Sequence, residues 1–176
     1  MFDPTAFENM KVVLEGALYD LDLSGEIKIS DRNDLVNTAK LSRSYDLSFT
    51  LANNNDKPIT AKLSLQSHLN NLAAELLDDS LSKSLAGSYL HLEFIVPHQQ
   101  EFADYNEIVK ILTEIWGTNR KMSIHTIFDP LAGHFVKSIA AVEFARLIRE
   151  EQMEDLIEMI DFMKITLYRL QTLHDR

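Results

Sequence analysis

The chain has no cysteine, few glycines and prolines, and no long apolar run. The absence of cysteine excludes disulfides, thiolate metal sites and a cysteine nucleophile. With only five glycines and four prolines, a glycine-rich phosphate loop is not expected, and neither GxGxxG nor GxxxxGK occurs. No stretch approaches the roughly 20 apolar residues that cross a bilayer. We therefore expect a cytoplasmic protein that does not bind membranes.

The chain also has few basic residues relative to acidic ones. The 176 residues include 17 Lys and Arg against 27 Asp and Glu, for a formal net charge of -10. A nucleic-acid partner requires basic residues gathered on one face, whereas here they are scattered along the chain. The composition, 45% hydrophobic and 25% charged, is ordinary for a globular protein. We expect an acidic protein with one domain over residues 1–176 and no nucleic-acid partner.

A β-hairpin is the clearest local signal. Apolar residues occupy every second position in "SYDLSFTL" (44–51) and in "PITAKLSL" (58–65), and "ANNNDK" between them favours a turn. Phe49 and Leu63 belong to the apolar face, and Ser48 belongs to the polar one. One apolar and one polar face are typical of an antiparallel sheet that is covered on one side only.

The remaining pattern alternates between helix and strand. Further strands are predicted at 26–30, 89–98 and 121–128, and helices at 4–21, 31–41, 69–77, 102–116 and 135–173. The helix at 102–116 joins the last two strands, which would form a right-handed crossover if they were neighbours. We therefore predict an α+β fold. It would be a single two-layer domain with a mixed sheet that contains the antiparallel hairpin, helices mainly on one face, and a long C-terminal helix.

Four polar residues are the candidates for ligand binding. His91 and Glu93 share one face of the strand at 89–98, and Ser123 and His125 share one face of the strand at 121–128. If these strands were adjacent, two imidazoles and a carboxylate could converge in a way that zinc accepts. The alternative is that these residues line the solvent-exposed face of a half-covered sheet. The spacing carries no zinc signature, so we predict no metal and no cofactor.

Catalysis has no signature in this sequence. Ser123, His125 and Asp129 lie too close along one strand to meet as nucleophile, base and orienting acid. No G-x-S-x-G elbow occurs either. We therefore name no catalytic residue.

The C-terminal helix has a broad apolar surface. A seam with three-four spacing is formed by Met153, Leu156, Ile160, Met163, Leu167 and Leu170. Phe162, Ile165 and Tyr168 lie beside that seam and are our interface candidates. A helix packed on one neighbour needs a narrower stripe, so this helix could contact both its own domain and a partner. The alternative is a central helix that is buried within its own domain.

These observations favour a small cytoplasmic protein-interaction module of adaptor, regulatory or chaperone-like character. Its partner would be another protein or a second copy, as a homodimer. The alternative is an enzyme, or a protein that binds a small ligand or a metal, with its site on the polar sheet face around His91, Glu93 and His125.

Overall fold

The computed structural model describes residues 5–52, 56–77, 80–98 and 105–175. Six strands form one sheet in the order β1-β2-β3-β4-β6-β5. The strands are β1 (Ile27–Asn37), β2 (Ser42–Leu51), β3 (Thr60–Ser67), β4 (Tyr89–Pro97), β5 (Lys121–Asp129) and β6 (His134–Glu143). The helices are α1 (Thr5–Leu23), α2 (Leu69–Ala74), α3 (Ser80–Leu85), α4 (Tyr105–Trp116) and α5 (Met153–His174), the last preceded by a short 3-10 turn at Glu150–Gln152. None of the described helices is long and apolar enough to span a membrane.

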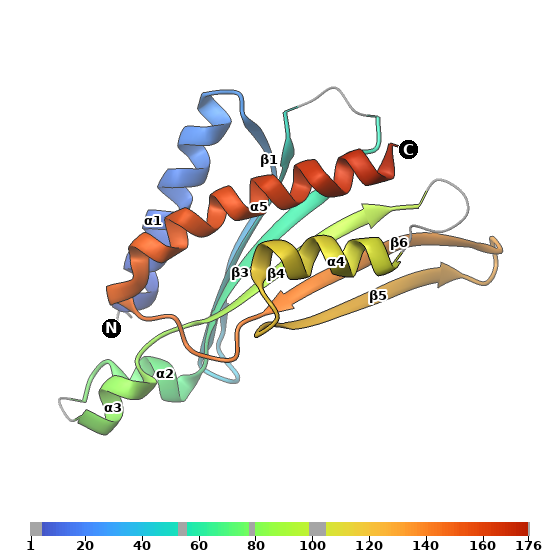
Figure 1. Ribbon diagram of the computed structural model, residues 1–176. Coiled ribbons are helices and arrows are strands. Elements are labelled where there is room, and N and C mark those ends of the chain that lie inside the picture. Colours follow the sequence, from blue (N-terminus) through green and yellow to red (C-terminus); the bar gives the residue numbers. More distant parts are fainter. Residues whose placement is uncertain (1–4, 53–55, 78–79, 99–104, 176) are drawn as a thin grey trace.

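The three long helices α1, α4 and α5 cover one face of the sheet, and α5 packs beside both of the others (Figure 1). The core lies between these two layers. On the sheet it includes Phe49, Leu63 and Phe94, all fully buried, because alternate side chains of each strand point toward the helices. The predicted α+β fold with two layers and a long C-terminal helix is confirmed.

The hairpin prediction is also confirmed. β2 and β3 pair antiparallel, with Leu47 opposite Leu63. Ser48, which we expected to face solvent, is nevertheless buried. It lies on the central part of β2, opposite Asp31 of β1 on one side and Lys62 of β3 on the other.

The expectation of a mixed sheet is wrong. All strand pairs of the described sheet are antiparallel, and β6 lies between β4 and β5. The strands joined by α4 are therefore not neighbours. The prediction fails because residues 135–143 belong to the strand β6 and not to the long final helix. Two ladders of backbone hydrogen bonds, together with the burial of Ala140 and Val142, outweigh the local preference of this segment.

The short helix expected at 31–41 is wrong as well. β1 continues to Asn37 and pairs with β2 as far as Ser42. Asp31, at the start of that segment, accepts a hydrogen bond from the backbone N–H of Arg32. At the other end of β1, Gly25 follows the end of α1 with φ of 77°, a left-handed conformation that glycine adopts without strain. The predicted first residue of this helix, at position 4, lies outside the described residues.

A charge cluster fastens α1 to the β1–β2 edge. Lys11 Nζ lies 2.6 Å from Glu8 and 2.8 Å from Asp34, and Arg43 lies 2.7 Å from Glu8 and 3.2 Å from Asp34. The guanidinium of Arg43 also sits 4.9 Å from the centre of the Phe7 ring. Two cations and two anions thus neutralise one another, and we call this group the α1–β1 charge cluster.

Candidate interaction surface

The polar face of the sheet does not assemble the predicted ligand site. His91 lies opposite Glu143 on β6, whereas His125 lies opposite Ile139, four residues away along that strand. Strand geometry therefore places the α-carbons of the two histidines about 16 Å apart. Glu93 and Ser123 do share a level, but Ala141 of β6 separates them. The described residues contain no group of three or more His, Cys, Asp or Glu side chains that could hold a metal ion.

Charges on this face are paired across neighbouring strands. Lys121 Nζ lies 2.9 Å from Glu143, and Lys62 Nζ lies 3.2 Å from Asp46. The hydrogen bond from Lys121 lowers the pKa of Glu143, and the nearby charges of His91 and other cations act in the same direction. Such pairing keeps an exposed sheet face soluble and requires no ligand.

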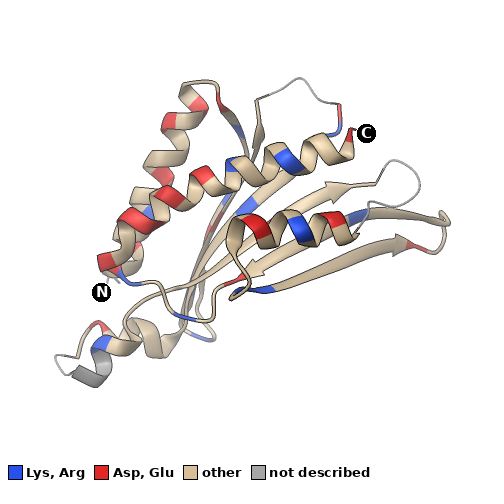
Figure 2. Cartoon of the chain, viewed as in Figure 1, with Lys and Arg blue, Asp and Glu red and all other residues tan. Residues whose placement is uncertain are grey.

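The two edges of the sheet differ in how they are protected. β1 contains a bulge between Ile29 and Asp31, and charged side chains follow it; both features discourage pairing with another chain. β5 pairs with β6 on one side and, in the described part of the chain, with no strand on the other. Between Lys121 and Asp129 at its two ends, β5 carries no Lys, Arg, Asp or Glu. Figure 2 shows this hairpin as largely free of charged residues.

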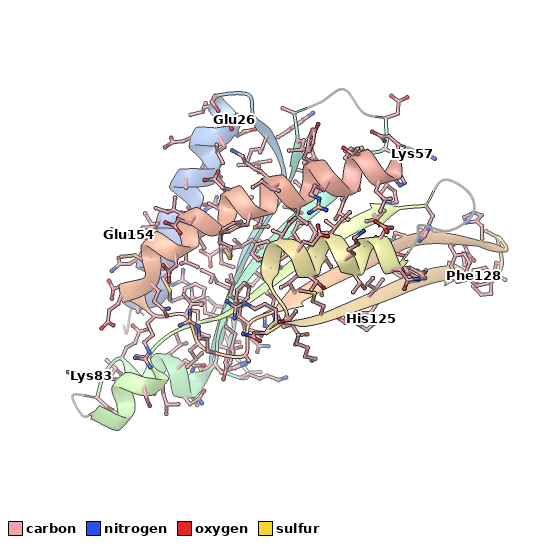
Figure 3. The ribbon with its side chains drawn as sticks, in the orientation of Figure 1. Glu26, Lys57, Lys83, His125, Phe128 and Glu154 are labelled. Carbon is pink, nitrogen blue, oxygen red and sulfur yellow. The ribbon has the colours of Figure 1, made fainter. Side chains whose placement is uncertain are left out.

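Apolar side chains gather at the end of the β5–β6 hairpin. We call them the hairpin cluster; all are exposed, and they are Ile127, Phe128, Leu131, Phe135 and Val136. The rings of Phe128 and Phe135 meet edge to face, with centroids 5.0 Å apart. Figure 3 shows Phe128 toward the tip of the hairpin and His125 beside β5, away from the helices. Several neighbouring apolar residues exposed together are unusual on a monomer and mark interaction surfaces.

One side of α4 extends this apolar surface above the β5 edge. Tyr105 and Thr113 face β5, since the Tyr105 hydroxyl is hydrogen-bonded to Thr126 and the Thr113 hydroxyl contacts Met122 Sδ at 3.8 Å. Val109 lies between them on the same side of the helix, at four-residue spacing from each. Val109 is exposed. The free edge of β5 is therefore flanked by apolar groups at its tip and along α4.

The apolar residues of α5 differ in how far they are buried. The seam residues face the core: Leu156, Ile160, Met163, Leu167 and Leu170 are buried. Neighbours on two sides, α1 and α4, explain most of the broad apolar circumference. Phe162 is 45% exposed, and its ring centre lies 6.0 Å from that of Trp116. Ile165 and Tyr168 are exposed as well.

Sequence reasoning missed the hairpin cluster because it assigned 135–143 to a helix. A signal was available in the segment "DPLAG". Asp129 Oδ1 accepts hydrogen bonds from the N–H groups of Leu131 and Ala132, and Gly133 adopts φ of 74°. Aspartate and glycine at these positions, between two stretches that carry apolar and β-branched residues, are typical of a hairpin turn.

Comparison of this chain with protein-family models, with curated proteins and with solved structures finds no significant match.

Proposed function

We propose that this protein is a non-enzymatic protein-interaction module that forms a homodimer through the free edge of β5. A cytoplasmic location is part of the same proposal. The observation that carries it is the contrast between the sheet edges. The bulge of the β1–β2 pair puts its extra residue on the edge strand β1, which is also charged, whereas the irregularity of the β5–β6 pair between Ile127 and Phe128 puts its extra residue, Val136, on β6. Within the described residues β5 is unpaired on its other side, and it is bordered by the hairpin cluster. An unprotected edge strand is a template for pairing with another chain.

A second copy of the chain is the occupant that the charges of β5 favour. If two β5 strands pair antiparallel with His125 at the twofold axis, Lys121 of each copy lies opposite Asp129 of the other. The same register places Met122 opposite Phe128. Opposite charges and apolar pairs directly across from each other both stabilise antiparallel strands. A twofold contact also repeats each favourable pair, which is typical of homodimers.

The flanking groups would enlarge this contact beyond the backbone ladder. In the twofold arrangement, the helices above β5 in the two copies lie on the same side of the joined sheet. Val109 of each copy then lies near the junction, and the exposed Ile127 and Phe128 gain a neighbour from the second copy. Burial of these apolar groups supplies the driving force that backbone hydrogen bonds alone supply only weakly.

Sedimentation by analytical ultracentrifugation at micromolar concentration tests the proposal. We expect a species of twice the chain mass for the wild type. Ile127→Lys should weaken self-association by about tenfold or more, because it introduces charge on both sides of the contact. Val12→Lys is the matched control: it also replaces an exposed β-branched residue, on α1, which packs at the other end of the sheet, and should leave the dimer intact.

A second pair of variants separates the two candidate interfaces. Lys121→Glu places a carboxylate opposite Asp129 of the other copy and should weaken the dimer, whereas Phe162→Glu combined with Ile165→Glu on α5 should not. A monomeric wild type would overturn the proposal. Dissociation by the α5 variant, with Ile127→Lys still dimeric, would overturn the β5 contact in favour of α5. Thermal melts of each variant distinguish dissociation from unfolding.

A further inference from the structure

A cavity of about 290 Å³ lies on the helix side of the sheet, remote from the polar face. It opens between the end of α4, the connection 144–148 and the first half of α5. Its base is apolar and is formed by buried side chains, namely Leu90, Ile148, Leu156 and Met159. An apolar base of this kind suits an organic ligand rather than a bare ion.

Aromatic rings form the walls of this cavity. Trp116 meets Phe144 at a ring-centre distance of 6.2 Å and Phe162 at 6.0 Å, both edge to face. The indole N–H of Trp116 donates a hydrogen bond of 3.1 Å to Thr166 Oγ1, which fixes the orientation of the ring. The walls are therefore held in place by the fold and could contact a planar apolar group.

Two arginines, Arg120 and Arg146, line the same cavity. The guanidinium of Arg120 lies 4.7 Å from the centre of the Phe144 ring, and its Nε is buried without a hydrogen-bond partner in the described structure. Arg146 lines the cavity as well, and neither arginine forms an ion pair with a described residue. A buried N–H that has lost water and gained no acceptor is unfavourable, and an anionic oxygen would satisfy it.

We propose that this cavity binds a small monocarboxylate with a planar apolar body. The guanidinium fork matches a carboxylate, and the aromatic walls match the body. Asp155 and Glu158 also line the cavity, so its formal charge is balanced and disfavours a dianion or polyanion. The volume is at the lower end for small-ligand sites, which limits the ligand to about one ring with a short acid arm. This inference does not depend on the proposed dimer.

Trp116 provides a direct readout because it is the only tryptophan of the chain. The probe is 3-phenylpropionate, titrated while the tryptophan fluorescence is recorded, and the matched neutral compound is 3-phenylpropionamide. We expect a saturable response to the acid and binding of the amide that is weaker by about tenfold or more, since a charge-assisted hydrogen bond is lost.

Variants locate the binding to Arg120. Arg120→Gln should weaken binding of the acid about tenfold and leave binding of the amide unchanged. Arg120→Lys should bind the acid with an affinity between those of the wild type and Arg120→Gln, because lysine keeps the charge without the guanidinium fork. Arg149→Gln removes the same charge from a residue outside the cavity lining and is the control. Equal binding of acid and amide, no saturable response, or equal effects of Arg120→Gln and Arg149→Gln would each overturn the proposal. Melting curves confirm that each variant is folded.

Discussion

Among the five glycines, Gly87 is the one where an added β-carbon would meet the closest contact. A β-carbon there would lie 2.6 Å from the carbonyl oxygen of Ile148 and 3.3 Å from Cβ of Leu147. The carbonyl cannot easily retreat. Ser88 N–H donates to it at 2.9 Å, and Ile148 N–H donates to the Ser88 carbonyl at 2.8 Å. The clash therefore falls on a two-bond bridge that holds the connection 144–148 against β4.

The magnitude follows from overpacking and from strain on that bridge. Overpacking in a tight contact costs about 1–3 kcal/mol, and each lost backbone hydrogen bond adds roughly 1 kcal/mol. We expect Gly87→Ala to lower the free energy of unfolding by about 2–4 kcal/mol. Gly16→Ala is the matched control, because a β-carbon at this position in α1 meets nothing within 4 Å. It should raise the free energy of unfolding by about 0.5–1 kcal/mol.

Urea denaturation followed by circular dichroism measures both variants. Circular dichroism reports the helices and strands together, so it does not depend on the environment of the single tryptophan near this connection. A neutral Gly87→Ala, or equal changes in the two variants, would refute the close approach of Ile148 to Gly87.

Two further predictions concern the hairpin core and the α1–β1 charge cluster. Phe49→Ala and Leu63→Ala should each lower the free energy of unfolding by about 2–5 kcal/mol because both side chains are fully buried between sheet and helices. Ser48→Ala should change it by less than about 0.5 kcal/mol, and equal sensitivity in urea melts would contradict a one-sided core. In this cluster the hydrogen bond from Lys11, helped by Arg43, lowers the pKa of Glu8. Burial alone would raise the pKa of Asp34, but the hydrogen bonds from Lys11 and Arg43 outweigh burial and lower it. Their contribution to stability is therefore complete above the unfolded pKa values of about 4 and is lost as the pH falls through the lower folded values. Thermal melts should show a smaller loss of stability between neutral and acidic pH in the double variant Glu8→Gln, Asp34→Asn than in the wild type; an unchanged loss would argue against the cluster.

The candidate site was only partly predictable. The alternation around His91 and Glu93 correctly placed these residues on the polar face of a strand, because the period of side chains along a strand is a local property. Whether His125 could join them depended on strand order, which alternation does not encode. The insertion of β6 between β4 and β5 separated them.

The arginine-lined cavity was also beyond sequence reasoning. Arg120 and Arg146 are separated along the chain by the whole β5–β6 hairpin, and Phe162 comes from a third element. Along the sequence they are two isolated basic residues in an acidic chain. These residues line one cavity only because the connection 144–148 pairs with Ser88 through Ile148.

The sequence by itself determined the α+β class, the hairpin of β2 and β3, the apolar face of β4 and the seam of α5, because each is written in a local period of apolar residues. Tertiary structure decided that β1 extends through 31–37 and that 134–143 is a strand, although the turn at 129–133 before the second of these carries a local hairpin signal. In both segments the local preference is weak, and pairing with distant strands supplies the free energy that selects the conformation. The free edge of β5 follows from the same cause, since an edge exists only once the order of strands is set.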